Sequence, residues 1–254
     1  MQIDIWCAFC DSVADPELLS RYTQLLTDAE RRQEARFHFA ADRHRYRVTR
    51  TLLRTTLSRY ADVPPERWTF EANTWGRPSI SNDSDEARRI CFNLSHTRKL
   101  VVLAVTRDCE LGIDTEDTVT RSTPLEIADR FFAPDEVAGL RALPAQRQAE
   151  RFFQYWTLKE SYIKARGMGL SLPLDQFAFH FPRPERIRLE IQPQLQDTAE
   201  RWRLWQWWVD EGRQHMVALC ARRMGAEPPK ILLKEIVPLA SEASLSGTLI
   251  ASSS

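Results

Sequence analysis

Hydrophobic and polar residues alternate with period two in some stretches and recur every three to four positions in others, which is typical of mixed α/β proteins. Strands are predicted at residues 3–9, 68–71, 90–94, 100–106, 111–114, 177–181, 187–191, 203–209 and 216–220. Helices are predicted at residues 16–26, 30–37, 41–60, 124–132, 134–143 and 149–166. A turn at residues 107–108 is expected to join two of the strands in a hairpin.

The order of these elements divides the chain into two halves, each with a long helix and several strands. Residues 1–108 form the predicted N-terminal half and residues 109–224 the C-terminal half, each long enough to bury its own core. The segment GAEPP and the tail SEASLSGTLIASSS predict that residues 225–254 are a linker and a disordered end.

Composition narrows the class of protein. The chain has 35 Lys and Arg against 35 Asp and Glu, and a formal net charge of zero argues against a protein that coats nucleic acid. No stretch reaches the roughly 18 apolar residues of a membrane span, and no secretory signal is expected from the pattern of the first residues. Five cysteines without repeated spacing disfavour a disulfide framework. A cytoplasmic protein that binds neither nucleic acid nor membrane is expected.

Charge is nevertheless segregated along the chain. Residues 31–59 contain nine Arg and only two acids, Glu34 and Asp42, whereas residues 110–117 contain four acids and no base. Such segregation predicts a strong local electrostatic field.

The acidic segment places two carboxylates on one face of a predicted strand. Asp114 and Glu116 are two positions apart in LGIDTE, so both lie on the face opposite Ile113. The two carboxylates repel each other unless a cation lies between them, and Mg²⁺ takes hard oxygen ligands while keeping positions open for phosphate oxygens. The alternative interpretation is a solvated edge strand with ordinary surface acids.

The predicted helix at residues 149–166 carries two charges inside its apolar face. Wound at about 100° per residue, Lys159 and Glu160 fall among aromatic and aliphatic side chains. A buried charge is costly unless it is paired or bound to metal, so Glu160 is a candidate metal ligand or general base, with Lys159 and Lys164 reaching phosphate. The alternatives are a structural ion pair and an exposed Glu160–Lys164 pair.

A third motif, FNLSHT at residues 92–97, ends a strand with the hydroxyl of Ser95 and the imidazole of His96, a common place for anion contacts. Gly167 and Gly169 permit close backbone approach after the long helix. The sequence contains no phosphate-loop, dinucleotide-binding, GxSxG or HExxH signature.

Taken in order, five motifs resemble those of the 4′-phosphopantetheinyl transferases of the Sfp type. They are GRP at 76–78, FNLSHT at 92–97, GIDTE at 112–116, RFFAPDE at 130–136, and WTLKES at 156–161 followed by Lys164, Gly167 and Gly169. The resemblance covers residues 42–174. It implies an α+β fold of two similar α/β halves related by a pseudo-twofold axis, with the active site between them, and a protein that works as a monomer.

The resemblance also implies a reaction that depends on coenzyme A. The phosphopantetheine arm would pass to a serine of an apo acyl or peptidyl carrier protein, releasing adenosine 3′,5′-bisphosphate. Asp114, Glu116 and Glu160 are implied to hold Mg²⁺, with Mn²⁺ as an alternative. Glu160 would also take the serine proton, directly or through water, while Lys164 and Lys159 neutralise phosphate charge.

Coenzyme A is implied to contact residues of the N-terminal half, together with Lys164. Ser95, His96 and Arg45 would bind its phosphates, with Arg45 on the 3′-phosphate. The backbone of Arg77 and Pro78 would flank the adenine.

The sequence departs from the family pattern at two points. Thr97 replaces a serine but keeps the hydroxyl. The upstream phosphate-binding lysines of some members have no clear match, so Arg31 and Arg32 are the candidate substitutes.

Two alternatives use the same residues. A Mg²⁺-dependent nuclease would use the acids for catalysis and the Arg-rich helix to grip DNA, leaving the Ser-His and GRP motifs without a role. A non-enzymatic module would bind a carrier protein or nucleic acid, with the acids serving structure.

Overall fold

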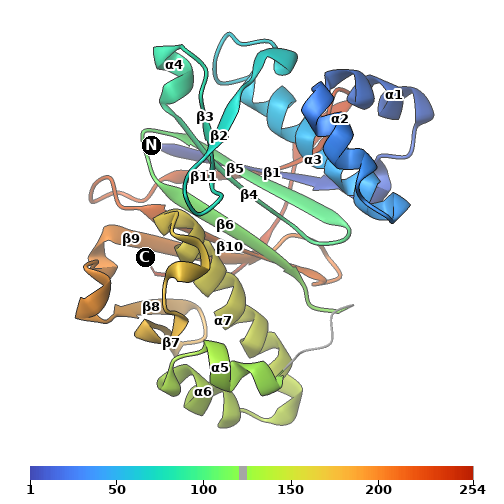
Figure 1. Cartoon of the computed structure of the whole chain (residues 1–254). Coiled ribbons are helices and arrows are strands. Elements are labelled where there is room, and N and C mark those ends of the chain that lie inside the picture. Colours follow the sequence, from blue (N-terminus) through green and yellow to red (C-terminus); the bar gives the residue numbers. More distant parts are fainter. Residues whose placement is uncertain (120–124, 254) are drawn as a thin grey trace. The chain divides into compact units, whose positions relative to one another are not determined.

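A computed structural model describes residues 1–119 and 125–253, which form the helices and strands labelled in Figure 1. The helices are α1 (Pro16–Leu25), α2 (Asp28–Ala35), α3 (Ala40–Leu57), α4 (Asp85–Arg88), α5 (Ala128–Phe131), α6 (Pro134–Arg141) and α7 (Ala145–Arg166). The strands are β1 (Gln2–Phe9), β2 (Phe70–Ala72), β3 (Pro78–Ile80), β4 (Ile90–His96), β5 (Leu100–Arg107), β6 (Leu111–Asp117), β7 (Phe177–Arg183), β8 (Arg186–Ile191), β9 (Trp202–Trp208), β10 (His215–Arg222), β11 (Lys230–Val237), β12 (Ser241–Ser244) and β13 (Thr248–Ser252). The predicted mixture of helices and strands is confirmed.

Local sequence signals account for several helix ends. Asp15 accepts a hydrogen bond from the Glu17 amide at the start of α1. Thr27 and Glu30 form a reciprocal capping box at the start of α2. Helix α7 ends at Gly167, whose positive φ of 66° suits a residue without a side chain. The predicted start of a helix at Pro124 lies outside the described residues.

The chain forms two compact units. The first comprises Met1–Asn73, Pro78–Asp108 and Pro229–Leu245, and the second comprises Thr74–Arg77, Cys109–Pro228 and Ser246–Ser254. In the described part of the chain, no helix is both long and apolar enough to cross a membrane.

The first unit is built on a five-stranded sheet in the order β12-β11-β1-β5-β4. Apolar side chains of β1, β4 and β5 pack against α1 and α3 in one core, which includes Trp6, Tyr22, Leu52 and Leu103. Helix α3 therefore buries one side in this core, although it carries many arginines.

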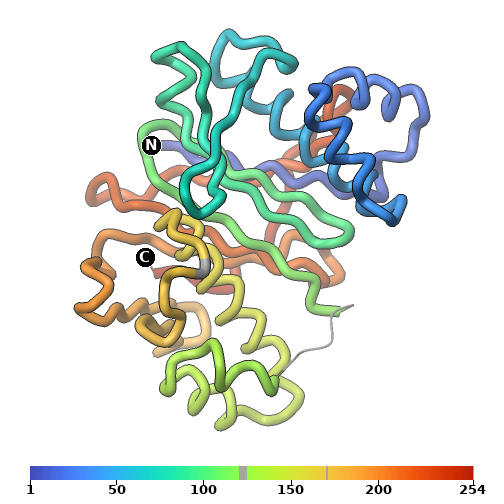
Figure 2. Tube along the Cα trace, viewed as in Figure 1, coloured from blue at the N-terminus to red at the C-terminus, as the bar shows by residue number. Residues whose placement is uncertain are grey.

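The end of the chain corrects the predicted disordered tail. Strand β11 pairs in parallel with β1, and β12 pairs with β11, so the red C-terminal segment lies beside the blue N-terminal strand in Figure 2. Strand β13 then pairs antiparallel with β9 in the second unit. The apolar residues ILL and IV between the polar ends of this segment explain why it joins a sheet.

The second unit is built on a six-stranded sheet in the order β6-β10-β9-β13-β8-β7. Helix α7 lies along β6 and β10, as Figure 1 shows. Aromatic side chains of the helix, including Phe152, Phe153 and Tyr162, form the core of this unit with Leu204 and Met216.

The predicted hairpin between residues 100–106 and 111–114 is wrong. Strand β5 pairs with β1 and β4, whereas β6 pairs with β10 in the other sheet. Asp108 takes a positive φ of 54° between them. Short strands on either side of a tight turn look the same in sequence whether or not they pair, so only tertiary packing separates the two outcomes.

Candidate active site

Strand β6 and helix α7 meet at Gly112. A Cβ atom at this position would lie 2.1 Å from the carbonyl oxygen of Ser161 and 2.3 Å from the amide nitrogen of Ala165. Only a residue without a side chain lets the two backbones come this close. The glycine of the GIDTE motif therefore places the acids that follow it directly beside α7.

Two acids of β6 act on Glu160 of α7 at this junction. Burial raises the pKa of Glu160, and the charge of Asp114 raises it further; Lys164 lowers it, Glu116 raises it again, and the result is about 7. Glu116 and Asp114 lie two positions apart on β6 and Glu160 lies on α7. The structure thus brings the three predicted acids into one electrostatic neighbourhood.

Lys164 lies in the same neighbourhood. Its Nζ donates to Oδ1 of Asp114 at 2.7 Å, and the side chain of Asp114 is only 7% exposed. The predicted i,i+4 alternative paired Lys164 with Glu160. The charge of Lys164 does act on Glu160, and its ammonium also forms an ion pair with Asp114. The ammonium therefore bridges α7 and β6.

The carboxylate oxygens of the three acids are ligands of the type that hard divalent cations prefer. Among the residues the structure describes, no group of three or more His, Cys, Asp or Glu side chains is arranged to hold a metal ion as it stands. The oxygens of Asp114, Glu116 and Glu160 are nonetheless the ligand type that Mg²⁺ prefers, and the repulsion that raises the pKa of Glu160 is what a bound cation offsets. The site fits a metal by donor type.

Lys159 faces away from these acids, contrary to the prediction that it reaches phosphate. Its Nζ donates to the carbonyls of Leu174 and Phe177, both at 2.7 Å, and pairs with Oε2 of Glu136 at 2.8 Å. These contacts use all three ammonium protons, and Lys159 is 1% exposed. Neighbouring positions on a helix point about 100° apart, so the side chains of Lys159 and Glu160 lie in different environments.

Glu136 is the partner that sequence reasoning missed. Besides binding Lys159, it accepts hydrogen bonds from the amides of Ala133 at 2.8 Å and Phe179 at 2.9 Å. Burial raises the pKa of Glu136 and lowers that of Lys159, and their attraction opposes both shifts. The signal was present: a lysine inside an apolar face needs a buried acid, and RFFAPDE supplies one.

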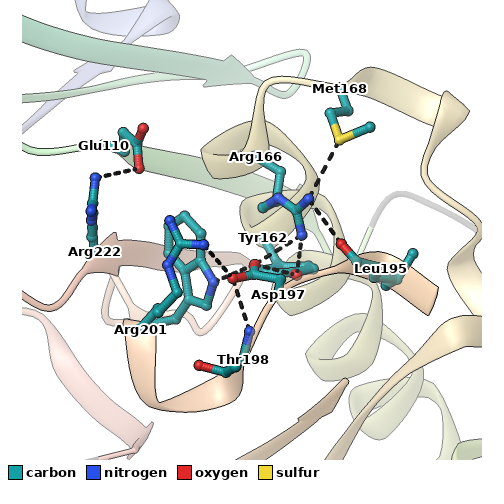
Figure 3. A network of polar contacts seen from close by, with 10 residues as sticks. Glu110, Tyr162, Arg166, Met168, Leu195, Asp197, Thr198, Arg201 and Arg222 are labelled. Atoms are coloured by element: carbon teal, nitrogen blue, oxygen red, sulfur yellow. Dashed lines mark hydrogen bonds and ion pairs between the residues drawn. The ribbon is translucent and has the colours of Figure 1, made fainter. Parts of the chain in front are cut away.

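A second buried carboxylate anchors the end of α7, as Figure 3 shows. Asp197 accepts from Tyr162 at 2.9 Å and Arg166 at 2.8 Å, both on α7. It also accepts from Trp202 at 2.7 Å and Arg201 at 3.0 Å. The hydrogen bonds from Trp202 and Tyr162 outweigh burial, so the pKa of Asp197 is lowered and the carboxylate stays charged. No feature of the sequence indicated this network.

The turn before β3 also contacts the end of α7. Arg77 donates through its guanidinium to the carbonyls of Lys164, Ala165 and Leu111. A Cβ atom at Gly169, where φ is 56°, would lie 3.5 Å from the Cβ atom of Trp75. Residues 74–77 and the glycines Gly167 and Gly169 are therefore neighbours in the second unit. Pro78, the last residue of the GRP motif, begins β3 in the first unit.

In the first unit, Arg45 lines a pocket of about 630 Å³ together with Phe39, Ala40, Ala41, Asp42 and Arg98. The guanidinium of Arg45 forms an ion pair with Asp42 at 2.8 Å, and the side chain of Arg45 is 18% exposed. Arg98, which the sequence analysis did not single out, brings a second positive charge to this pocket.

Ser95 and His96 end strand β4, with Ser95 buried and His96 exposed. The hydroxyl of Thr97 accepts from the amides of Lys99 at 3.2 Å and Leu100 at 3.1 Å. Thr97 thus shapes the turn that follows, a task for which the hydroxyl matters and the extra methyl group does not.

The Arg-rich segment is far less basic in space than in sequence. Arg54 and Arg50 bind Glu30, and Arg47 binds Glu34. Arg31 is a candidate phosphate ligand. Its guanidinium instead donates to the carboxylate of Asp28 and to the carbonyls of Thr23 and Leu26. Arg32 is exposed. The predicted strong field of this helix is therefore largely neutralised.

Two models of known protein families match the chain. Residues 110–220 match the 4′-phosphopantetheinyl transferase superfamily, and residues 14–108 match the N-terminal region of 4′-phosphopantetheinyl transferases.

Three relatives show how far the likeness extends. The 4′-phosphopantetheinyl transferase Sfp of Bacillus subtilis is 31% identical over 187 residues, covering 74% of this chain and 80% of Sfp. The 4′-phosphopantetheinyl transferase HetI of a Nostoc species is 34% identical over 168 residues, covering 66% of this chain and 70% of HetI. A further Bacillus subtilis 4′-phosphopantetheinyl transferase, ffp, is 30% identical over 223 residues, covering 86% and 92%.

These matches define the class as transferases with a two-part mixed α/β fold. The chain belongs to the 4′-phosphopantetheinyl transferase superfamily. It is a transferase that uses coenzyme A, and the nuclease alternative finds no support.

Proposed function

We propose that the protein transfers the phosphopantetheine arm of coenzyme A to a serine hydroxyl of an apo acyl or peptidyl carrier protein. Adenosine 3′,5′-bisphosphate is the leaving product. The observation that supports this most is the close contact of β6 with α7 at Gly112, which brings the acids of β6 beside the helix that carries Glu160 and Lys164. Lys164 donates to Asp114 across this contact at 2.7 Å. Displacement at phosphorus needs alignment and charge neutralisation more than covalent help from the protein.

Asp114, Glu116 and Glu160 would hold the Mg²⁺ ion, with Mn²⁺ as an alternative. A divalent cation on these oxygens supplies charge neutralisation for the pyrophosphate and relieves repulsion among the carboxylates. All three residues belong to the unit that matches the superfamily over residues 110–220.

Glu160 would accept the proton of the carrier serine, directly or through a water molecule. A carboxylate held beside the reacting phosphate is the type of group that accepts a proton in general base catalysis. Lys164 would stabilise negative charge on the phosphates, because its ammonium is already held beside Asp114. Lys159 takes no part in the reaction in this proposal, because its protons are bound elsewhere.

The pocket of Arg45 and Arg98 would bind the 3′-phosphate of coenzyme A. Arginine suits this task because its planar guanidinium offers paired donors to phosphate oxygens. Ser95 and His96 would contact the other phosphates, and the backbone of Arg77 and Pro78 would flank the adenine. A monomeric state and a cytoplasmic location stay predictions of the sequence.

The test is direct incubation of the protein with coenzyme A, Mg²⁺ and a panel of apo carrier proteins from fatty-acid, polyketide and nonribosomal-peptide pathways. Mass spectrometry should show a carrier that gains one phosphopantetheine. The same carrier with its serine changed to alanine should gain nothing. A panel that stays unmodified, with DNA cleaved by the same preparation, would contradict the proposal.

A further inference from the structure

The side chain of Arg77 binds the junction between α7 and β6. One terminal nitrogen of its guanidinium donates to the carbonyls of Lys164 at 2.7 Å and Ala165 at 2.9 Å. The other donates to the carbonyl of Leu111 at 3.0 Å. A single side chain thus ties the last turn of the helix to the start of the acidic strand.

The end of α7 and the start of β6 each have a physical reason to accept hydrogen bonds from Arg77. The last carbonyls of a helix lack amide partners within the helix, and a positive charge there is favourable to the helix dipole. Leu111 directly precedes Gly112, where the two backbones come so close that a Cβ atom would overlap Ser161. A contact this tight leaves no side chain between strand and helix, so Arg77 locks the junction from the adjoining turn.

We propose that Arg77 is a positioning residue, whose guanidinium holds the last turn of α7 on β6 and thereby holds Lys164 against Asp114. The proposal rests on the proposed function, because only there do these two residues act on the transferred phosphate. The backbone of Arg77 would flank the adenine in the same reaction. One residue would then serve both coenzyme A binding and the alignment of the catalytic helix.

Lysine is a poor substitute at this position. The three carbonyls are reached by two separate nitrogens of a rigid planar group, whereas the lysine ammonium is a single point on a flexible stem. Reacting groups tolerate little displacement, and a shift of about 1 Å can cost roughly 100-fold in rate. The effect of losing the guanidinium should therefore appear in kcat.

The experiment compares Arg77→Lys and Arg77→Ala with the native protein in carrier modification. We expect kcat to fall about 10-fold in Arg77→Lys and about 100-fold in Arg77→Ala, while the KM for the carrier stays unchanged. Millimolar guanidinium chloride, compared with sodium chloride at equal ionic strength, should restore part of the kcat of Arg77→Ala. Arg89→Ala is the matched control, because the exposed guanidinium of Arg89 binds Asp108 in the first unit. This variant should keep the native kcat.

Hydrogen exchange separates failure of this proposal from failure of the proposed function. Amides at residues 163–167 should exchange faster in Arg77→Ala than in the native protein, whether or not a carrier is modified. Native kcat in Arg77→Ala would overturn the positioning role. So would unchanged exchange, or a parallel loss of kcat and melting temperature without rescue by guanidinium. A native protein that modifies no carrier would contradict the proposed function instead.

Discussion

Helices α3 and α7 both carry charged side chains, but the surroundings of these charges differ. The arginines of α3 find acids on α2: Glu30 and Glu34 are 7% and 6% exposed and bind three of them. On α7, Glu160 faces Asp114 and Glu116, which carry charge of the same sign. The acids of α2 balance arginines of α3, whereas beside α7 the charges of Asp114 and Glu116 act on Glu160 even though Lys164 pairs with Asp114.

The difference shows which charges are available for chemistry. Balanced ion pairs hold helices together and leave little field outside, whereas a cluster of like charges attracts a counter-ion. Segregation along the sequence indicated both regions equally. Only the packing of α2 on α3, and of α7 on β6, separates the structural region from the functional one.

The largest expected effect comes from Glu160→Gln, which keeps the shape of the side chain and removes its charge. We expect kcat for carrier modification to fall about 10³-fold, because both the base and a cation ligand are lost. Glu150→Gln, at an exposed position on the same helix, is the control and should keep native activity. If Glu160→Gln lost only a few-fold, α7 would resemble α3 and its acid would be structural.

A smaller effect, on stability, is expected from Glu30→Gln. The change leaves Arg54 buried without its carboxylate, although Arg54 keeps its bonds to the carbonyls of Pro65 and Trp68. We expect the free energy of unfolding in urea at neutral pH to fall by about 2 kcal/mol, with kcat unchanged. Glu17→Gln, an exposed acid on α1, should change little.

The same variant has a defined pH dependence. Burial would raise the pKa of Glu30, but hydrogen bonding to Arg54 and the charge of Arg50 outweigh it and hold the pKa below its usual value. Such a group stabilises the fold above its unfolded pKa, and the contribution is lost as pH falls through the folded pKa. Native protein should therefore lose more stability than Glu30→Gln below about pH 4.5. Parallel curves for the two proteins would contradict the pairing.

The smallest expected effect separates the arginines of the first unit. Arg45→Ala should raise the KM for coenzyme A about tenfold, equivalent to about 1.4 kcal/mol, and Arg98→Ala should act in the same direction. Arg31→Ala should not, because Arg31 is bound to Asp28 and to backbone carbonyls. With coenzyme A lacking its 3′-phosphate, native and Arg45→Ala should have equal KM values. A difference that persists with that substrate would remove Arg45 from the 3′-phosphate.

Sequence patterns predicted most helices and strands before residue 225, because short-range signals define them, such as the capping box at Thr27 and the glycine after α7. They missed β11, β12 and β13. They also identified Asp114 and Glu160 as candidate site residues, because a charge within an apolar pattern is costly to bury unless it is paired or bound to metal. They failed where partners lie far apart in sequence. The pairing of β11 with β1, the Lys159–Glu136 ion pair and the Asp197 network all depend on residues that are distant along the chain.

The central claim is that the acids beside α7 form a divalent-cation site, and Mn²⁺ binding tests it most directly. Electron paramagnetic resonance of free Mn²⁺, titrated with protein and coenzyme A, counts bound ions without relying on turnover. We predict one tight site per native chain, lost in Asp114→Asn and retained in Glu110→Gln, whose side chain is half exposed and pairs with Arg222. Equal Mn²⁺ binding by native protein and Asp114→Asn would contradict the account.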